Sequence, residues 1–382
     1  MKWNIFAKRT GTICLLSYFL IVVCSCVKNE TEPITLRPSQ HISIPIISSV
    51  PPSTFCIRYL ETDDDELVYY LDRDRNRIII YSIRTLDKVK ELKFLNEGDQ
   101  GVGTITGFSI LSQDSIILSS LGKPWFYLIN ENGIIIQKID FRWDNDSQEA
   151  VYTPLSSKHN SEVYKYKDNL YFLQQLYQAT TLARNYKVVA EYNLSNRRGV
   201  LTDFYFPKDY FDNGRLLDVA SLAFDGQDKL VYSLRGSHYL YVYNVNTKLT
   251  NKVEAVSEYL DDFKIVEGNS PLDYFEYIVK NGGYESIIFD KYRNLFYRIV
   301  RLKPNDLSTI KKNELQNAVD FPDRFSIIVF DKDLIKMSET VLDGNYYNIY
   351  NFFVGKEGLY ISNNNPSNPN YDEDMLQFEV LK

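Results

Sequence analysis

A short apolar and aromatic stretch recurs six times along this chain of 382 residues. Taking one residue of each copy as equivalent gives steps of 47, 64, 51, 87 and 48 residues. The short steps are close to the roughly 40 to 50 residues of a four-stranded propeller blade, so the two long steps require insertions. The spacing therefore predicts an all-β chain folded as a six-bladed β-propeller. The six copies are Ile78–Ile83, Trp125–Asn130, Val188–Asn193, Tyr239–Asn244, Ser326–Asp331 and Met375–Val380.

A second pattern precedes most of these copies, namely two strand-like segments joined by a short loop that contains Asp, Asn or Gly. The chain also contains 30 Tyr and 22 Phe, which favour pleated and half-buried positions. A small sheet that is apolar on both faces can bury them only against its neighbours, so a ring of blades suits this composition. The hairpins are expected at Tyr166–Tyr171, Phe224–Tyr232, Phe289–Tyr297 and Val354–Tyr360.

Closing such a ring usually requires a strand from one terminus to complete the sheet at the other. We expect His41–Ile46 or Phe55–Leu60 to pair with the last blade near Met375–Val380. The longest step of the repeat, between Tyr243 and Phe330, is expected to hold a short helix near 270–282, since Ser270-Pro271 is typical of a helix start and Asn281-Gly282 of a helix end. A second helical stretch is expected near Leu307–Ala318, and a seventh blade in this region is the alternative.

The N-terminus has the pattern of a bacterial lipoprotein signal peptide. Lys2, Lys8 and Arg9 precede the apolar run Gly11–Val23, which is too short to span a bilayer comfortably. Val23-Cys24-Ser25-Cys26 resembles a lipobox, in which the last cysteine is acylated. Cys24 is the competing acceptor, and a secreted protein without lipid is the other alternative. We expect a signal peptide at 1–25, a tether at 26–40 and one propeller domain at 41–382, anchored to the outer membrane through Cys26 and either periplasmic or surface-exposed.

The remaining composition argues against several functions. The net charge of −7 and the sequence pI near 5.3 make nucleic acid an unexpected partner. Cys56 is the one cysteine left in the expected domain, and it alternates with apolar neighbours, so we expect a small buried residue rather than a nucleophile. With only three histidines in the chain, a Cys/His catalytic pair is not expected.

Two motifs resemble ligand loops without meeting their requirements. Gly101–Gly107 has a dinucleotide-like glycine pattern, but its spacing is one residue too long, and the following residues predict a β-hairpin instead of a helix that could receive phosphate. Asp72–Asn76 resembles the start of a calcium loop, but Arg77 stands where the turn needs Gly, so a hairpin turn is expected. No cofactor, metal site or catalytic residue is predicted.

Two loops have the composition of a propeller ligand site. Phe141–Asn145 contains Trp143, which could stack on a sugar or anchor the loop on the core. Asn363–Tyr371 is rich in Asn and Pro. Trp143 is the tentative ligand residue.

The segment Asn96–Ile105, together with the lipobox and the Tyr-rich blades, resembles a lipoprotein family of Bacteroidota. Its members carry a domain of unknown function for which a six-bladed β-propeller is predicted. The resemblance rests on a Glu-Gly-x-x-Gly-Val segment, here Glu97–Val102, and on the rhythm of the blades. It implies a fold and a cellular address, and gives no catalytic residue to carry over.

Two classes of function follow from these observations. The first is a lipid-anchored, non-catalytic scaffold that binds a protein, a peptide or a glycan. The second is an enzyme that degrades a carbohydrate or another polymer with carboxylates at the channel mouth. Inward carboxylates with perturbed pKa values in a deep pocket would favour the enzyme, and a plugged channel would favour binding. A structural subunit would instead expose one broad apolar patch.

Overall fold

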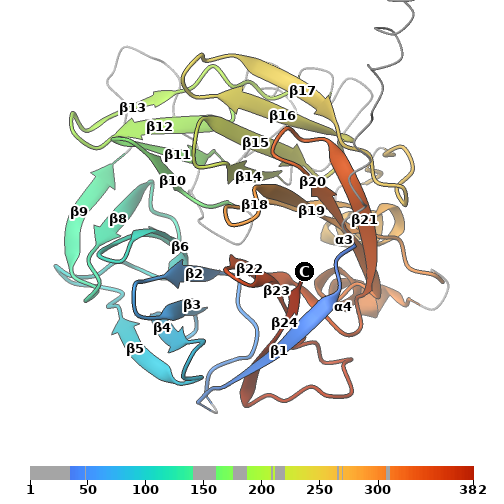
Figure 1. Ribbon diagram of the computed structural model, residues 1–382, viewed down its shortest axis with the longest axis horizontal. Coiled ribbons are helices and arrows are strands. Elements are labelled where there is room, and N and C mark those ends of the chain that lie inside the picture. The colour runs from blue at the N-terminus through green and yellow to red at the C-terminus, as the bar shows by residue number, and fades with distance from the viewer. Residues whose placement is uncertain are drawn as a thin grey trace, which may run out of the picture. The chain divides into compact units, whose positions relative to one another are not determined.

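The structure is a computed structural model that describes residues 35–47, 49–140, 161–174, 187–207, 210, 220–264, 266–268, 270–306 and 310–382. One compact unit spans Thr35–Lys382. Within this unit, six antiparallel sheets of four strands each surround a central axis (Figure 1). The described chain is therefore a six-bladed β-propeller, as the repeat predicts.

Each blade begins at the central axis and continues outward strand by strand (Figure 1). Blade 1 contains β2 (Ile57–Glu61), β3 (Glu66–Asp72), β4 (Arg77–Ser82) and β5 (Lys88–Lys93). Blade 2 contains β6 (Ile105–Ser112), β7 (Ser115–Ser120), β8 (Trp125–Ile129) and β9 (Ile135–Asp140). Blade 3 contains β10 (Tyr164–Tyr166), β11 (Asn169–Leu173), β12 (Val189–Asn193) and β13 (Arg198–Leu201).

The other three blades follow the same plan. Blade 4 contains β14 (Ala220–Phe224), β15 (Lys229–Leu234), β16 (Tyr239–Asn244) and β17 (Thr250–Glu254). Blade 5 contains β18 (Gly283–Asp290), β19 (Leu295–Arg301), β20 (Arg324–Phe330) and β21 (Lys336–Asp343). Blade 6 contains β22 (Asn348–Gly355), β23 (Gly358–Ser362), β24 (Met375–Leu381) and β1 (Pro38–Pro45).

The six repeated stretches of the sequence all form the third strand of a blade, namely β4, β8, β12, β16, β20 and β24. The expected hairpins join the first and second strands of blades 3 to 6. Gly101–Gly107 leads into the hairpin of β6 and β7, and Asp72–Asn76 is the turn between β3 and β4, as predicted for both segments. The described residues form no seventh sheet.

The ring closes between the two ends of the unit. Strand β1 pairs antiparallel with β24, with Ile42 opposite Phe378 and Ile44 opposite Leu376. This confirms the first of the two expected pairings, whereas Phe55–Leu60 supplies β2, the inner strand of blade 1. Strand β1 starts at Pro38, a few residues before the start expected for the domain.

Apolar side chains fill the spaces between neighbouring blades. The cluster between blades 6 and 1, for example, joins Tyr70 and Tyr81 to Phe353 and Phe378. The central strands are buried on both faces, and every residue of β4 is buried. Both faces of such a strand are apolar, so an isolated blade would expose most of its buried side chains to water. The complete ring is therefore the unit that is stable.

The long step between blades 4 and 5 contains the expected helix, α3 (Pro271–Asn281). Ser270 Oγ accepts a hydrogen bond from Asp273 N at 3.2 Å, and Asp273 Oδ2 accepts one from Ser270 N at 2.8 Å. These bonds satisfy two of the free donors at the helix start. A second helical piece, η3 (Lys312–Glu314) and α4 (Leu315–Asp320), overlaps the second expected stretch.

The inner strand of each blade has one side without a partner strand in its own sheet. Side chains of neighbouring blades bond to backbone groups on that side. Ser221 Oγ accepts from Ile287 N at 3.0 Å and donates to Ile287 O at 3.4 Å. Asn351 does the same with Thr54, with both distances 2.9 Å. The inner strands are thus joined through small polar side chains.

Cys56 belongs to this set of residues. It is fully buried, and its Sγ lies 3.4 Å from both the N and the O of Phe108 in the next blade. Burial raises the pKa of the thiol despite the nearby Arg58. The prediction that Cys56 is buried is confirmed. Its hydrogen bonds to the backbone of Phe108 could not be predicted from the apolar residues beside it in the sequence.

We expect Cys56→Ser to lower the free energy of unfolding by less than about 1 kcal/mol, because a hydroxyl can make the same two bonds. Cys56→Ala should cost about 1–3 kcal/mol, because both backbone groups of Phe108 lose this partner. Denaturant titration of the two variants beside the parent protein measures the difference. Equal losses for Ser and Ala would mean that the volume of sulfur matters and its hydrogen bonds do not.

Candidate functional site

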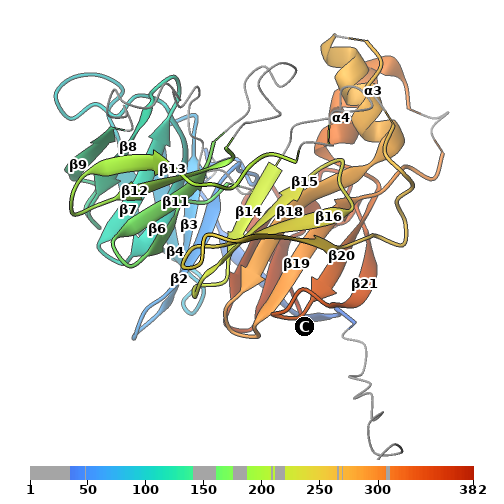
Figure 2. The same ribbon diagram turned by 90° about the horizontal axis from the view of Figure 1, so that it is seen from above.

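The helices lie on one face of the propeller, here called the helix-bearing face (Figure 2). Helix α3 precedes the inner strand β18, and η3 with α4 connects β19 to β20. The strands of a blade are antiparallel. The connection from the second to the third strand and the connection from the fourth strand to the next blade therefore lie on the same face of the propeller. The C-terminus lies on the other face (Figure 2).

A cavity of about 370 Å³ opens on the helix-bearing face, in the range of small-molecule sites. The long connection between β19 and β20 forms most of its lining, and helix α3 and the connections before β22 and β24 complete it. Its apolar side consists of Val279, Leu302, Pro304, Ile310, Ala318, Phe321 and Pro322. Its polar side consists of Arg301, Asn305, Asp306, Glu314, Asn317, Asp323, Asn345 and Ser367.

One acceptor on the polar wall of this cavity has no hydrogen-bond partner. Asp323 Oδ2 accepts from Asn305 N at 3.3 Å, while Asp323 Oδ1 is buried without a hydrogen-bond partner. Asn305 Oδ1 accepts from Arg324 Nη1 at 2.6 Å. A ligand with hydroxyl or amine donors would suit the remaining amide, hydroxyl and carboxylate groups.

A buried ion cluster supports the floor of the cavity. Glu285 of β18 receives two bonds from Arg235, at 2.7 and 2.5 Å, and one from Arg301 Nε at 2.7 Å. Arg301 also donates to the carbonyls of Ala318 and Val319 in α4, so its guanidinium holds the helix on the blade. Burial alone would raise the pKa of Glu285, but the two arginines outweigh it and lower that pKa to about 2.

The sequence here allows an unusually close approach of backbone and side chain. Gly283 has φ +142, and a Cβ on this residue would lie 2.6 Å from Arg235 Cγ. Only glycine avoids that overlap in this conformation. The second glycine after α3 therefore leaves room for the arginine that pairs with Glu285.

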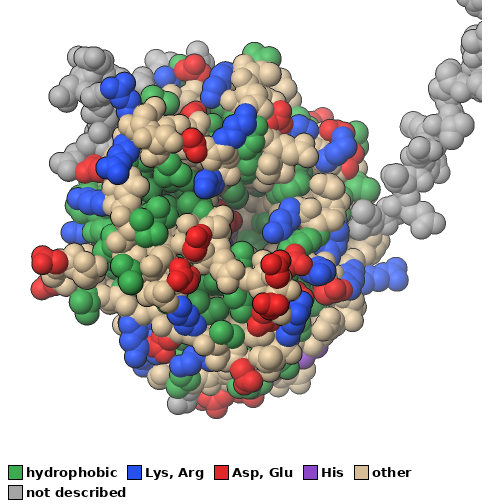
Figure 3. All heavy atoms as spheres, turned by 60° about the vertical axis from the view of Figure 1, so that its left-hand side comes forward, with side chains coloured by type: hydrophobic (Ala, Val, Ile, Leu, Met, Phe, Trp, Pro, Cys, Tyr) green, Lys and Arg blue, Asp and Glu red, His purple; other side chains and the backbone are tan. Residues whose placement is uncertain are grey.

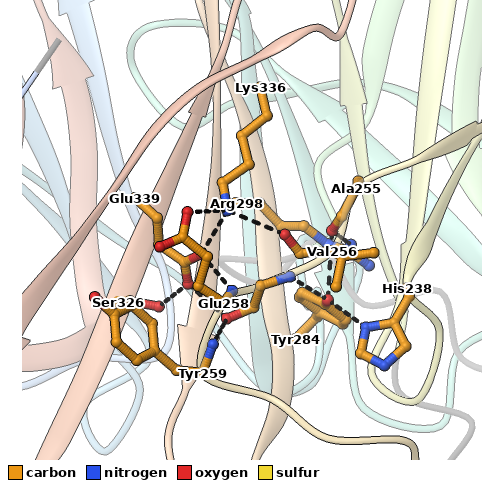
Figure 4. A network of polar contacts seen from close by, with 11 residues as sticks. His238, Ala255, Val256, Glu258, Tyr259, Tyr284, Arg298, Ser326, Lys336 and Glu339 are labelled. Atoms are coloured by element: carbon orange, nitrogen blue, oxygen red, sulfur yellow. Dashed lines mark hydrogen bonds and ion pairs between the residues drawn. The ribbon is translucent and has the colours of Figure 1, made fainter. Parts of the chain in front are cut away.

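A second polar network joins blades 4 and 5 (Figure 4). Glu339 accepts from Ser257 Oγ, Ser326 Oγ and Lys336 Nζ, at 2.5, 2.6 and 2.9 Å. Beside it, the guanidinium of Arg298 lies 3.2 Å from the centre of the Tyr284 ring. The bonds to Glu339 join strands β20 and β21 of blade 5 to Ser257, in the connection after β17 of blade 4.

His238 adjoins this network, with Nδ1 2.8 Å from the hydroxyl of Tyr284 (Figure 4). Burial and the charge of Arg298 lower the pKa of His238, so its imidazole is neutral at neutral pH. The same Tyr284 hydroxyl accepts from Ser257 N at 3.1 Å. These contacts give the histidine a structural partner.

Contacts on the other face join blade 1 to its neighbour, blade 6, and also to blade 5, which is not adjacent to it. Tyr292, in the first turn of blade 5, donates to Glu61 of blade 1 at 2.9 Å. Lys356 of blade 6 donates to the other oxygen of Glu61 at 3.1 Å. Tyr59 stacks on Phe353 with ring centres 5.7 Å apart. These side chains belong to the inner strands or first turns of blades 1, 5 and 6.

The carboxylates supply a further distinction between binding and catalysis. Every pKa shift seen among the described carboxylates is downward, as for Glu91, Glu285 and Glu339. A carboxyl that acts as a general acid needs the opposite shift. Within the described residues, no group of three or more His, Cys, Asp or Glu side chains is placed to hold a metal ion.

The sites expected from sequence have different outcomes. Cys26 and the loop Phe141–Asn145 with Trp143 lie outside the described residues. Asn363–Tyr371 is a structural loop, because four of its five asparagines, Asn363, Asn364, Asn365 and Asn368, are buried. The side chains of Asn364, Asn365 and Asn368 donate to nearby backbone carbonyls. Ser367 of this loop lines the cavity. Most of the lining residues come from the connection between β19 and β20, and their signal in the sequence was only the excess length of that step.

The charges on the surface of the propeller are mixed. Acidic and basic side chains are interspersed with apolar ones over the face shown in Figure 3. No broad basic surface of the kind that binds nucleic acid is seen on the described part of that face. No helix in the described ranges is both long and apolar enough to span a membrane.

Comparison with known proteins identifies the family. The chain resembles a crystal structure of a DUF4221 member from Bacteroides vulgatus, with a TM-score of 0.77 and 22% identity over 92% of this chain and 98% of that one. A protein of Bacteroides fragilis described as exported has a TM-score of 0.55 and 11% identity over 91% and 95%. No curated protein matches. The family model for DUF4221, a domain of unknown function, matches residues 37–341, and the chain therefore belongs to the DUF4221 family.

Proposed function

We propose that this protein is a lipid-anchored propeller of the cell envelope that binds a partner without catalysing a reaction on it. The lipobox-like stretch that ends at Cys26 supports the anchor. The similarity to an exported Bacteroides protein is consistent with an envelope address. The outer membrane is the proposed site of attachment.

The cavity on the helix-bearing face is the observation that carries the binding role. It combines an apolar wall with one buried acceptor that has no hydrogen-bond partner, Asp323 Oδ1, and Arg301 of the buried ion cluster lies in its lining. Such a site can hold a small polar ligand, or one projecting group of a larger protein, peptide or glycan. Preformed walls lower the entropy that binding would cost.

The downward pKa shifts support binding over polymer hydrolysis. Glycoside hydrolysis commonly uses one carboxylic acid that stays protonated near neutral pH and one ionised carboxylate. Glu285, the inner-strand carboxylate with the best-defined environment, is ionised and fully engaged by two arginines. It therefore has no proton to donate to a leaving group.

The test is a pull-down from native membranes with the acylated protein, with retained proteins and glycans identified by mass spectrometry. We expect Asn317→Trp to lose the bound partner, because Asn317 lies exposed on the cavity wall and an indole would fill the space. Gln316→Trp is the matched control, since it adds the same side chain to the exposed neighbour outside the cavity. Cys26→Ala tests the need for the anchor.

Two results would refute parts of the proposal. Retention of the same partner by Asn317→Trp and the parent protein would mean that the cavity is not the binding site. Degradation of a polymer from a glycan panel by the purified domain would contradict the non-catalytic role.

A further inference from the structure

The chain enters the propeller on the face opposite the helices. Strand β1 begins beside the C-terminal end of β24, where Arg37 and Lys382 exchange backbone hydrogen bonds of 2.8 and 3.0 Å. Leu36 is buried, and its N–H bonds to Thr340 Oγ1 at 3.3 Å. The chain is therefore fixed to the domain from Leu36 onward, on the helix-free face (Figure 2).

The position of Cys26 limits how far this face can lie from a membrane. Thr35 is the ninth residue after Cys26, and a fully extended chain of that length spans at most about 30 Å. With lipid on Cys26, the helix-free face is thus held closer to the bilayer than the opposite face. This step rests on the lipid anchor of the proposed function.

Three turns on the helix-free face present an aliphatic side chain at the same structural position. In each, the last residue accepts a backbone hydrogen bond from the Asn or Asp that opens the turn, namely Asn130 with Ile134, Asn244 with Leu249 and Asp331 with Ile335. Ile134, Leu249 and Ile335 are 58%, 65% and 64% exposed, respectively. They belong to blades 2, 4 and 5 and are spread around the ring.

Exposure alone does not select this face, because Leu95 and Leu121 on the helix-bearing face are 63% and 57% exposed. The place where the chain enters decides between the two faces. Charge does not draw the turns to lipid, since Lys332 is paired with Asp333 at 2.7 Å and Glu131 lies in the turn of Ile134. Aliphatic turn tips can still enter the headgroup region once an anchor holds them there.

We infer that the helix-free face rests on a lipid surface, with Ile134, Leu249 and Ile335 inserted among the headgroups. The anchor supplies most of the affinity, and the three tips set the orientation. The cavity on the helix-bearing face then points away from the membrane, toward a partner in solution or on another surface.

The experiment places the acylated protein on vesicles of phosphatidylethanolamine and phosphatidylglycerol that contain a spin-labelled quencher lipid. One protein carries an environment-sensitive fluorophore at Thr247→Cys, in the turn of Leu249, and another at Leu272→Cys, at the start of α3. Cys56 is fully buried and does not compete for the label. Flotation with the vesicles reports the anchor, and quenching reports the orientation.

We expect lipid to quench the label at position 247 and to leave the label at position 272 bright. Combining Ile134→Ser, Leu249→Ser and Ile335→Ser should abolish that quenching while flotation persists. The matched control, Leu95→Ser with Leu121→Ser, should leave quenching unchanged. Three results with protein that still floats would overturn the inference but not the anchor. They are quenching at position 272, quenching at neither position, and quenching at position 247 that survives the triple change. Failure to float overturns both.

Discussion

Glu285→Gln should lower the free energy of unfolding by about 3–5 kcal/mol, because it leaves two buried guanidinium groups without a counter-charge. The side chains of Arg235, Glu285 and Arg301 are 6%, 3% and 1% exposed, so water cannot replace the lost carboxylate. The amide has nearly the volume of the carboxyl, and cavity formation does not contribute. Thermal or denaturant unfolding of the variant and the parent protein measures the loss.

A matched control comes from the exposed pair of Glu357 with Lys382, whose atoms lie 2.7 Å apart. Glu357→Gln should change stability little, because solvent screens that pair. A similar small effect of Glu285→Gln would contradict the view that the buried cluster ties blades 4 and 5 and helix α4 together.

The pH dependence of Glu285→Gln has a defined sign. The pKa of Glu285 falls from 4.5 to about 2 on folding, so its contribution is complete above the unfolded value and is lost as the pH falls toward 2. The stability difference between the parent and the variant should therefore be constant near neutral pH and shrink below about pH 4. A difference that instead grows on acidification would show that another group dominates.

The architecture was predictable from the sequence because each blade has recognisable patterns within a short stretch of the chain. The third strands are continuous apolar runs that must be buried on both faces, and the hairpin turns carry Asp, Asn or Gly at fixed places. The capped start of α3 at Ser270 and its end at Gly282 are likewise local signals. Each of these features depends on residues close together in the chain.

The cavity and the ion clusters could not be predicted in the same way. Arg235, Glu285 and Arg301 lie in different strands and connections, and nothing in their local sequence distinguishes them from exposed charged residues. The role of Cys56 depends on Phe108 in the next blade. The segment Asn363–Tyr371 has a loop-like composition, but its Asn364 and Asn365 are buried and donate to nearby backbone carbonyls. Contacts across blades are set by ring closure, which single-strand patterns do not encode.

Arg298→Met should lower the free energy of unfolding by about 2–4 kcal/mol, because buried acceptors lose their donor. The guanidinium of this fully buried residue donates to Ala255 O at 2.9 Å (Figure 4). It also donates to Ser233 Oγ at 3.0 Å and to Ser237 O at 2.7 Å. Burial lowers the pKa of Arg298 to about 10, so removing the charge relieves part of its desolvation cost. The loss of these bonds outweighs this relief, at about 1–3 kcal/mol each, even though Ala255 O keeps the Tyr284 hydroxyl as a donor at 3.3 Å.

Hydrogen exchange can separate this mechanism from a general loss of packing. Arg298 belongs to β19 of blade 5, whereas Ser233, Ser237 and Ala255 belong to blade 4 or its connections. We therefore expect Arg298→Met to increase amide exchange most in β15, β16 and β17, at the interface it bridges. Arg298→Lys should lose at least as much stability, because one ammonium keeps the buried charge but cannot span all three acceptors. The exposed Arg73→Met is the control for a lost surface charge. Full stability of Arg298→Met would mean that apolar packing alone holds blades 4 and 5 together.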